Sequence, residues 1–237
     1  MHKFRLLVPV VLAGVLTTTG CAGSASPGVA ARVGDETITA GEVDETTRHL
    51  CTALGERFKE EGRLVQLGVI RQGVLQFLVL RSQADQLAEE YGVEPSAAYR
   101  QAVAEHARTA TDFPEEVRDD YVTVLSTDAL ASDIASQVGR IELAEEGFTE
   151  PTEEQVQQAA RDAFTSWPDA NGIDVDPKYG IELVDGVLTE VDTSLSFAVS
   201  DKARAGLPVD PDPADPGAVP EPDPAYVGSL PSNQTCG

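Results

Sequence analysis

The pattern of apolar positions predicts a strand pair near the start of the chain, followed by helices. Residues 29–39 alternate apolar and polar side chains around a Gly-Asp pair, which is typical of a short hairpin. Thr39 and Glu42 have the spacing of a capping box, so we expect a helix to begin there and to end near Glu61. Residues 64–91 carry apolar side chains at helical spacing on more than one face. This breadth predicts a helix that several neighbours bury, or one that leaves a groove open.

The helical period continues through the middle of the chain and then gives way to strands. Residues 99–109 predict a weaker amphipathic helix, Pro114 fits the first turn of the next one, and a second capping box at Thr152 opens a helix to about Trp167. Residues 178–195 are rich in Val, Leu, Ile and Thr around an Asp-Gly pair, which predicts a type I′ hairpin. Because these late strands need partners, we expect them to join the first hairpin in one small sheet.

The beginning of the chain predicts secretion. Basic residues precede residues 6–16, an uncharged apolar run that is shorter than the roughly 20 residues a membrane-spanning helix needs. Residues 18–20 are small, and Cys21 follows them, in an arrangement that resembles a lipobox, where the cysteine is acylated and becomes the new N-terminus. We therefore expect lipidation at Cys21 and attachment to the membrane by acyl chains. The alternative is an ordinary secretion signal cleaved within residues 22–25.

Acidic residues dominate the composition. The chain has 17 basic and 40 acidic residues, a formal net charge of −23. Removal of residues 1–20 would take two positive charges and leave −25, which is 15 minus 40. Such a surface repels phosphate groups, so nucleic acid and anionic lipid headgroups are excluded as expected partners.

Two cysteines remain once Cys21 is set aside. Cys51 lies in the first predicted helix, and Cys236 is the penultimate residue. In an oxidising compartment two leftover thiols are expected to pair, so we predict a Cys51–Cys236 disulfide. The alternative is two free thiols, one buried and one in a frayed tail.

No pattern of reactive side chains predicts catalysis or metal binding. His49 and Cys51 are two positions apart on a helix, so their side chains diverge and do not form a nucleophile pair. The acidic residues around Asn171 do not fit the register of a calcium loop, since Ile173 takes a ligand position. We also find no phosphate-binding loop and no nucleophile elbow. The expectation is no catalytic residue, no metal and no cofactor.

Several segments resemble the SurA-type chaperones and the PrsA-type foldases, in the order in which that family has them. Residues 31–44 resemble the family's first strand and helix, and residues 64–93 resemble its long apolar helix. Residues 150–156 with Phe164 resemble the helix that closes the domain, and residues 176–180 and 195–197 resemble its returning strands. Together the segments cover about residues 29–200.

The resemblance implies a helical domain that captures extended, unfolded segments of exported proteins in an apolar groove. Family members often carry a parvulin prolyl-isomerase domain, but residues 96–170 keep a helical period and lack its glycine-rich strands and paired histidines. The resemblance thus implies the chaperone part without the isomerase. For the aromatic residues on or beside the helices, core packing is favoured over contact with a ligand. The expected peptide-binding residues are Leu67, Ile70, Val74, Phe77, Leu78, Tyr121 and Trp167.

These observations together predict a mainly α fold with a small terminal β-sheet (α+β), in a membrane-anchored extracytoplasmic lipoprotein. The expected parts are a signal peptide at 1–20, a linker at 21–28, the helical domain at 29–200 and an extended Pro/Asp-rich tail at 201–237. The expected partners are unfolded or extended exported polypeptides. The alternative is an accessory lipoprotein that docks one specific partner, and a peptidyl-prolyl isomerase is the least favoured function.

Overall fold

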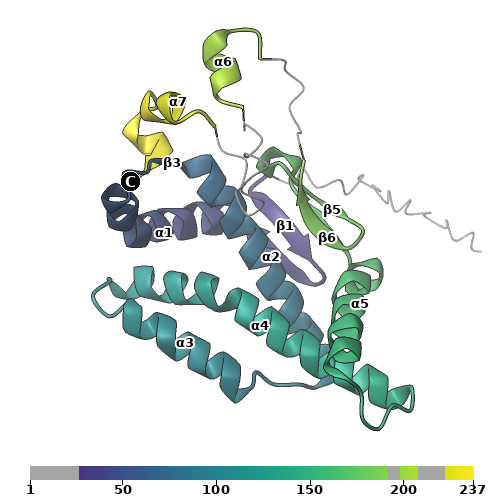
Figure 1. Cartoon of the computed structure of the whole chain (residues 1–237). Helices are drawn as coiled ribbons and strands as arrows, with labels where there is room; N and C mark the ends of the chain where they lie inside the picture. Colours follow the sequence, from purple (N-terminus) through teal and green to yellow (C-terminus); the bar gives the residue numbers. More distant parts are fainter. Residues whose placement is uncertain (1–26, 192–197, 208–221) are drawn as a thin grey trace, which may run out of the picture.

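Five long helices and three small antiparallel sheets make up the part of the chain that the computed structural model describes, residues 27–191, 198–207 and 222–237 (Figure 1). The expected mainly α fold with a small β part is therefore confirmed. Cys21 and the predicted signal peptide and most of the predicted linker lie outside the described residues. The long helices are α1 (Ala40–Glu60), α2 (Leu67–Tyr91), α3 (Ala97–Thr109), α4 (Glu115–Glu145) and α5 (Glu153–Asn171).

Local sequence sets where these helices begin and end. The Thr39 side chain accepts a hydrogen bond from the Glu42 backbone at 3.1 Å, and the Glu42 carboxylate accepts one from the Thr39 backbone at 3.4 Å. Thr152 opens α5 with the same reciprocal pair. Gly92 ends α2 with φ of +64°, a left-handed conformation that glycine adopts without strain. Both predicted capping boxes are confirmed.

The core lies between α2, α4 and the first hairpin. Helix α4 packs against α1, α2 and α5, and α3 folds back along its first half (Figure 1). The crossing of α4 and α5 is close, because a Cβ at Gly139 would lie 2.7 Å from the Ala160 backbone nitrogen. The largest fully buried apolar side chains include Leu75, Val79, Leu87, Leu130, Ile134 and Val138.

Helix α5 continues beyond its predicted end at Trp167 and contains Pro168. A proline inside a helix cannot donate to the carbonyl four residues earlier, which here belongs to Phe164. The Gln83 side chain of α2 supplies the missing donor, with its Nε2 2.7 Å from the Phe164 oxygen. A partner from another helix thus lets α5 run through its proline, which sequence alone does not reveal.

The sheet that closes the domain differs from the predicted one. Strand β1 (Val29–Val33) lies between β2 (Glu36–Thr39) and β4 (Ile173–Val175). The late hairpin, β5 (Ile181–Val184) with β6 (Val187–Glu190), forms a separate two-stranded sheet, so the prediction that it joins the first hairpin is wrong. The short η1 helix (Pro177–Tyr179) redirects the chain after β4. The Asp-Gly turn itself is confirmed, with positive φ at Asp185 and Gly186.

The end of the chain is folded where it is described, which corrects the expected extended tail at 201–237. Short helices α6 (Asp201–Ala205), α7 (Pro224–Gly228) and η2 (Ser232–Gln234) precede β7 (Thr235–Cys236), which pairs with β3 (Val65–Gln66). Residues 208–221 lie outside the described part. The proline count predicts poor packing, yet Val227 and Cys236 are buried. The predicted domain boundary at residue 200 therefore does not separate residues 222–237 from the domain.

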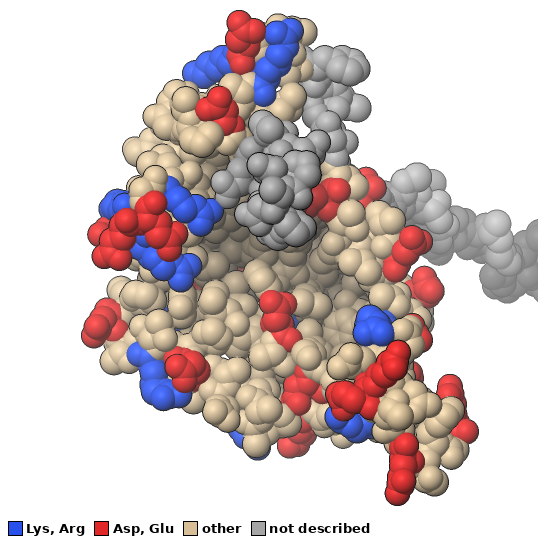
Figure 2. All heavy atoms as spheres, in the orientation of Figure 1, with Lys and Arg blue, Asp and Glu red and all other residues tan. Residues whose placement is uncertain are grey.

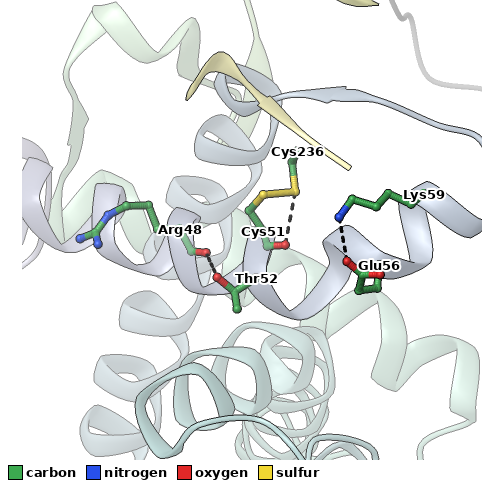
Figure 3. The surroundings of a disulfide bond; sticks show 6 residues. All are labelled: Arg48, Cys51, Thr52, Glu56, Lys59 and Cys236. Atoms are coloured by element: carbon green, nitrogen blue, oxygen red, sulfur yellow. Dashed lines mark hydrogen bonds and ion pairs between the residues drawn. A yellow bond between two sulfur atoms is a disulfide. The ribbon is translucent and has the colours of Figure 1, made fainter. Parts of the chain in front are cut away.

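A cysteine pair fixes this C-terminal segment to α1. Cys51 and Cys236 lie at disulfide-bonding distance, with 5.6 Å between their Cα atoms, as the sequence predicted (Figure 3). The figure shows β7 crossing over α1 at this point, beside the Lys59–Glu56 ion pair. The link joins positions 185 residues apart and brings the end of the chain back to the first helix.

Candidate functional site

A largely apolar cavity of about 470 Å³ lies between α2, α5 and the β5–β6 hairpin, and Asp128 of α4 also lines it. A second hollow of about 410 Å³, between α4 and α5, shares Leu80, Arg161 and Phe164 with it. We call the two together the hairpin groove. Figure 2 shows a hollow near the centre of this view, with mostly uncharged residues inside it and both acidic and basic residues around it. The apolar residues of the cavity are Phe77, Leu80, Phe164, Leu183, Val187 and Leu188.

The groove exists because α2 has apolar residues on more sides than its neighbours cover. Val74, Leu75 and Val79 are buried in the core, whereas Phe77 and Leu80 on the flank are only half-buried. The broad apolar stripe of residues 64–91 therefore has both of its predicted consequences, since one side is buried and the other lines a groove.

The hairpin closes the groove at the side of α5. A Cβ at Gly186 would collide with the Thr165 backbone oxygen, so the turn needs glycine for its close approach to α5 as well as for its φ of +76°. This contact holds Leu183, Val187 and Leu188 opposite the aromatic ring of Phe164 and the side chains of α2. The glycine at the turn and the contact of that turn with Thr165 therefore together shape the groove.

Five of the side chains that line the cavity are polar, namely those of Gln76, Gln83, Asp128, Arg161 and Thr165. Gln83 is held by the Phe164 carbonyl, and the Arg161 guanidinium donates to Gln158 Oε1 at 2.7 Å. An apolar interior with a few polar groups suits the burial of large apolar side chains. The hydroxyl of Thr165, which also lines the cavity, donates to the Arg161 backbone oxygen at 2.9 Å within α5.

The predicted peptide-binding residues do not form one surface. Only Phe77 lines the cavity. Leu67, Ile70 and Leu78 are half-buried along α2 but do not line it, and Leu78 instead lies beside β2. Three others are core residues, which corrects their assignment to a binding surface. Val74 is 1% exposed, and Tyr121 and Trp167 are each 6% exposed.

The contacts of the two buried aromatic residues explain why they are not available. The Tyr121 ring packs edge-on against Phe113, with 5.5 Å between ring centres. The Trp167 Nε1 donates to Glu90 Oε2 at 3.1 Å, so this indole connects α5 with α2. Tyr121 and Trp167 are therefore both part of the core, in agreement with the core-packing alternative. Leu183, Val187 and Leu188 also line the cavity but were not among the residues expected to bind peptide. Their signal was the apolar hairpin around the Asp-Gly turn, but sequence does not show which helix that turn contacts.

A third hollow, between α1 and α4, is acidic. It measures about 590 Å³ and is lined by carboxylates around His49. The His49 ring nitrogen Nδ1 lies 2.6 Å from Asp120 Oδ2, and both side chains are partly buried. This contact connects α1 to α4, so His49 has a structural partner and does not face Cys51. Within the described ranges, no group of three or more His, Cys, Asp or Glu residues is placed to hold a metal ion.

A polar cluster fixes the first hairpin to α2. Ser82 donates to the Glu36 carboxylate, and Gln86 donates to the Val33 carbonyl at 2.7 Å. Burial raises the pKa of the neighbouring Asp85. The positive charge of Arg81 partly offsets this rise, and the negative charge of Glu36 adds to it. These contacts satisfy the polar groups of the turn and position the hairpin, and they lie outside the groove.

Comparison of the chain with models of protein families, with curated proteins and with solved structures finds no match. None of the helices in the described ranges is both long enough and apolar enough to cross a membrane.

Proposed function

We propose that this chain is an extracytoplasmic lipoprotein that holds unfolded or extended polypeptide in the hairpin groove and has no isomerase activity. The observation that supports the proposal is the open cavity of about 470 Å³ lined by six apolar side chains from two helices and a hairpin. A water-exposed apolar surface of this kind favours burial of apolar side chains from a partner, at about 25 cal/mol per Å². The resemblance of the first strand and helices to SurA-type chaperones supports the same class of partner.

Binding of this kind is expected to be weak and reversible. An unfolded segment loses conformational freedom when it is bound, and that loss offsets much of the gain from apolar burial. The high negative charge keeps a membrane-tethered protein soluble and favours basic partners at low ionic strength. Modest affinity with little selectivity is what transient capture of many polypeptides needs.

The experiment is suppression of aggregation, with a matched pair of variants. The mature chain should slow the light scattering of a reduced, denatured client without accelerating a proline-peptide isomerisation assay. Phe77→Ser removes an apolar side chain from the groove and should raise the amount of chain needed for half-suppression about tenfold. Phe148→Ser is the control, because Phe148 is 43% exposed and lies outside the groove. Thermal melting of both variants separates binding from stability.

Two outcomes would contradict the proposal. A several-fold excess of the chain without any suppression of aggregation would refute polypeptide capture, and robust isomerisation would refute the absence of catalysis. The rival function is docking of one fixed partner. Crosslinking in intact cells distinguishes the two, since capture predicts many unrelated products and docking predicts one stoichiometric product.

A further inference from the structure

The outer strand of the β5–β6 hairpin has an edge that no other described strand covers. The sheet consists of β5 and β6 alone among the described residues. Three of the four β6 residues are exposed, whereas Ile181 of β5 is fully buried. Such an edge presents backbone N–H and C=O groups to whatever lies beside it.

The register of the hairpin identifies which residues present these groups. Val184 pairs with Val187 across the two-residue turn, and this closing pair exchanges hydrogen bonds. Hydrogen-bonded pairs alternate along an antiparallel ladder, and the Val191 nitrogen indeed donates to the Gly180 oxygen at 2.9 Å. It follows that the backbone groups of Leu188 and Glu190 point away from β5, toward the open edge.

This edge runs beside the groove. Leu188 has its side chain in the cavity and its backbone groups at the open edge. A chain paired with β6 would lie about 4.8 Å from it and would direct alternate side chains to the face that carries Leu183 and Leu188. One large apolar side chain of such a chain would enter the cavity opposite Phe77 and Phe164.

The charged residues of the hairpin and the cavity limit which polypeptide segments can bind beside β6. The hairpin carries Glu182, Asp185 and Glu190, all exposed, and has no lysine or arginine. Asp128 adds a further acidic group, while Arg161 is the one cation among the residues that line the cavity. An acidic segment would therefore be repelled, and a segment with lysine or arginine beside its apolar residues would be attracted.

We propose that the groove takes its polypeptide by strand addition: an extended segment with basic and large apolar residues pairs with the outer edge of β6 through Leu188 and Glu190 and inserts one apolar side chain beside Leu188. This inference rests on the proposed function and specifies how that site recognises its partner. Main-chain hydrogen bonds do not depend on the side chains of the bound segment, so pairing with the strand edge suits polypeptides of many sequences. The cavity adds a preference for a large apolar side chain.

The first arm of the test uses labelled peptides with the full mature chain and fluorescence anisotropy. The probe is about seven residues long, a typical strand, with a central phenylalanine and lysine at both ends. A matched peptide is N-methylated at the two positions whose N–H groups would face β6. It should bind about tenfold more weakly, because it loses two hydrogen bonds and keeps every side chain. A third peptide with glutamate in place of lysine should also bind more weakly, and the difference should shrink as salt rises.

The second arm changes the edge. Glu190→Pro removes an outward N–H that β5 does not use, and proline is tolerated at strand edges. Glu190→Gln is the control, since it removes the same charge and keeps the N–H. We expect Glu190→Pro to weaken binding of the unmethylated peptide about fivefold relative to Glu190→Gln, with circular dichroism unchanged.

The outcomes separate the two proposals. Equal affinity of the methylated and unmethylated peptides, in a chain that suppresses aggregation, would overturn strand addition alone. Absence of binding by every peptide, together with no suppression, would overturn the proposed function as well. If sedimentation shows a dimer that Glu190→Pro dissociates, the edge belongs to a second copy of this chain and strand addition of a client is overturned.

Discussion

At the scale of single residues, two helical glycines of the same chain have opposite roles. A Cβ at Gly139 would meet the Ala160 backbone nitrogen at 2.7 Å and the Val156 oxygen at 2.9 Å, so α4 and α5 would have to separate. A Cβ at Gly73, inside α2, would point into open space, with nothing beyond the helix's own backbone within 4 Å. We expect Gly139→Ala to lower the free energy of unfolding by about 1–3 kcal/mol. Gly73→Ala should raise it by about 1 kcal/mol, because alanine favours the helix. Urea unfolding measures both, and equal effects would contradict the close crossing.

Tyr91 is the residue whose ionisation the structure shifts most clearly. Its hydroxyl donates to Glu142 Oε1 at 2.7 Å, and this bond, reinforced by burial and nearby acidic charge, raises the pKa of Tyr91 to about 12. A raised pKa means that the contribution to stability is complete below the unfolded pKa near 10 and is lost as the pH rises toward 12. Phenolate absorbance of Tyr91 should therefore develop late, in addition to that of Tyr179, whose pKa burial also raises. Comparison with Tyr91→Phe identifies it, and an unchanged late phase would contradict the assignment.

At the scale of elements, the proline of α5 depends on a side chain of α2. Gln83→Leu should leave the Phe164 carbonyl without its donor and cost about 1–3 kcal/mol of unfolding free energy. Pro168→Ala returns a backbone N–H to the same carbonyl, so Gln83→Leu should cost less in that background. Urea unfolding of the four chains of this double-mutant cycle measures the coupling. Additive effects of the two substitutions would show that Gln83 does not act through the carbonyl.

The elements that sequence predicts well are those whose ends are encoded locally. Thr39, Thr152 and Gly92 mark helix boundaries through their own hydrogen bonds and backbone angles, and Asp185 with Gly186 fixes a turn. These depend on neighbours within a few residues, so a single sequence is enough to find them.

Predictions fail where the partner is distant in the chain. A tryptophan suits a binding groove and a core equally well, so its sequence position does not distinguish the two for Trp167. Only its hydrogen bond to Glu90 in the folded structure shows that it connects α5 with α2. The short strand β4 has three residues, too few for a periodic pattern, and its place beside β1 comes from the tertiary fold. The hairpin was found from sequence, but its contact with Thr165, which shapes the groove, was not.

At the scale of the whole molecule, the proposed anchor has a direct test. Cys21 follows the small residues of the lipobox-like segment, and no other residue near it could take an acyl chain on sulfur. Cys21→Ser should move the chain from the membrane fraction to the soluble fraction, because stable attachment needs acyl chains. Immunoblots of fractionated cells measure this, with Cys51→Ser as a control that keeps the lipobox. A Cys21→Ser chain that stays membrane-bound like the parent would contradict lipidation.

The Cys51–Cys236 disulfide connects the C-terminal segment to α1, and its removal should act on both stability and local order. Linking positions 185 residues apart restricts the unfolded chain strongly, so we expect loss of the bond to cost about 2–5 kcal/mol. Strand β7 has only two residue pairs with β3, which is too little to hold residues 222–237 without the covalent link.

A Cys236→Ser chain should therefore unfold at lower urea, and its C-terminal segment should exchange amide hydrogens faster, while the α4–α5 contact far from the link stays protected. Non-reducing peptide mapping of the parent should find Cys51 joined to Cys236, and labelling of both as free thiols would contradict the bond. If Cys236→Ser lowers stability without faster exchange in residues 222–237, the segment is held by its own contacts, principally the buried Val227. Because the hairpin groove does not include this segment, polypeptide capture should survive the loss of the disulfide.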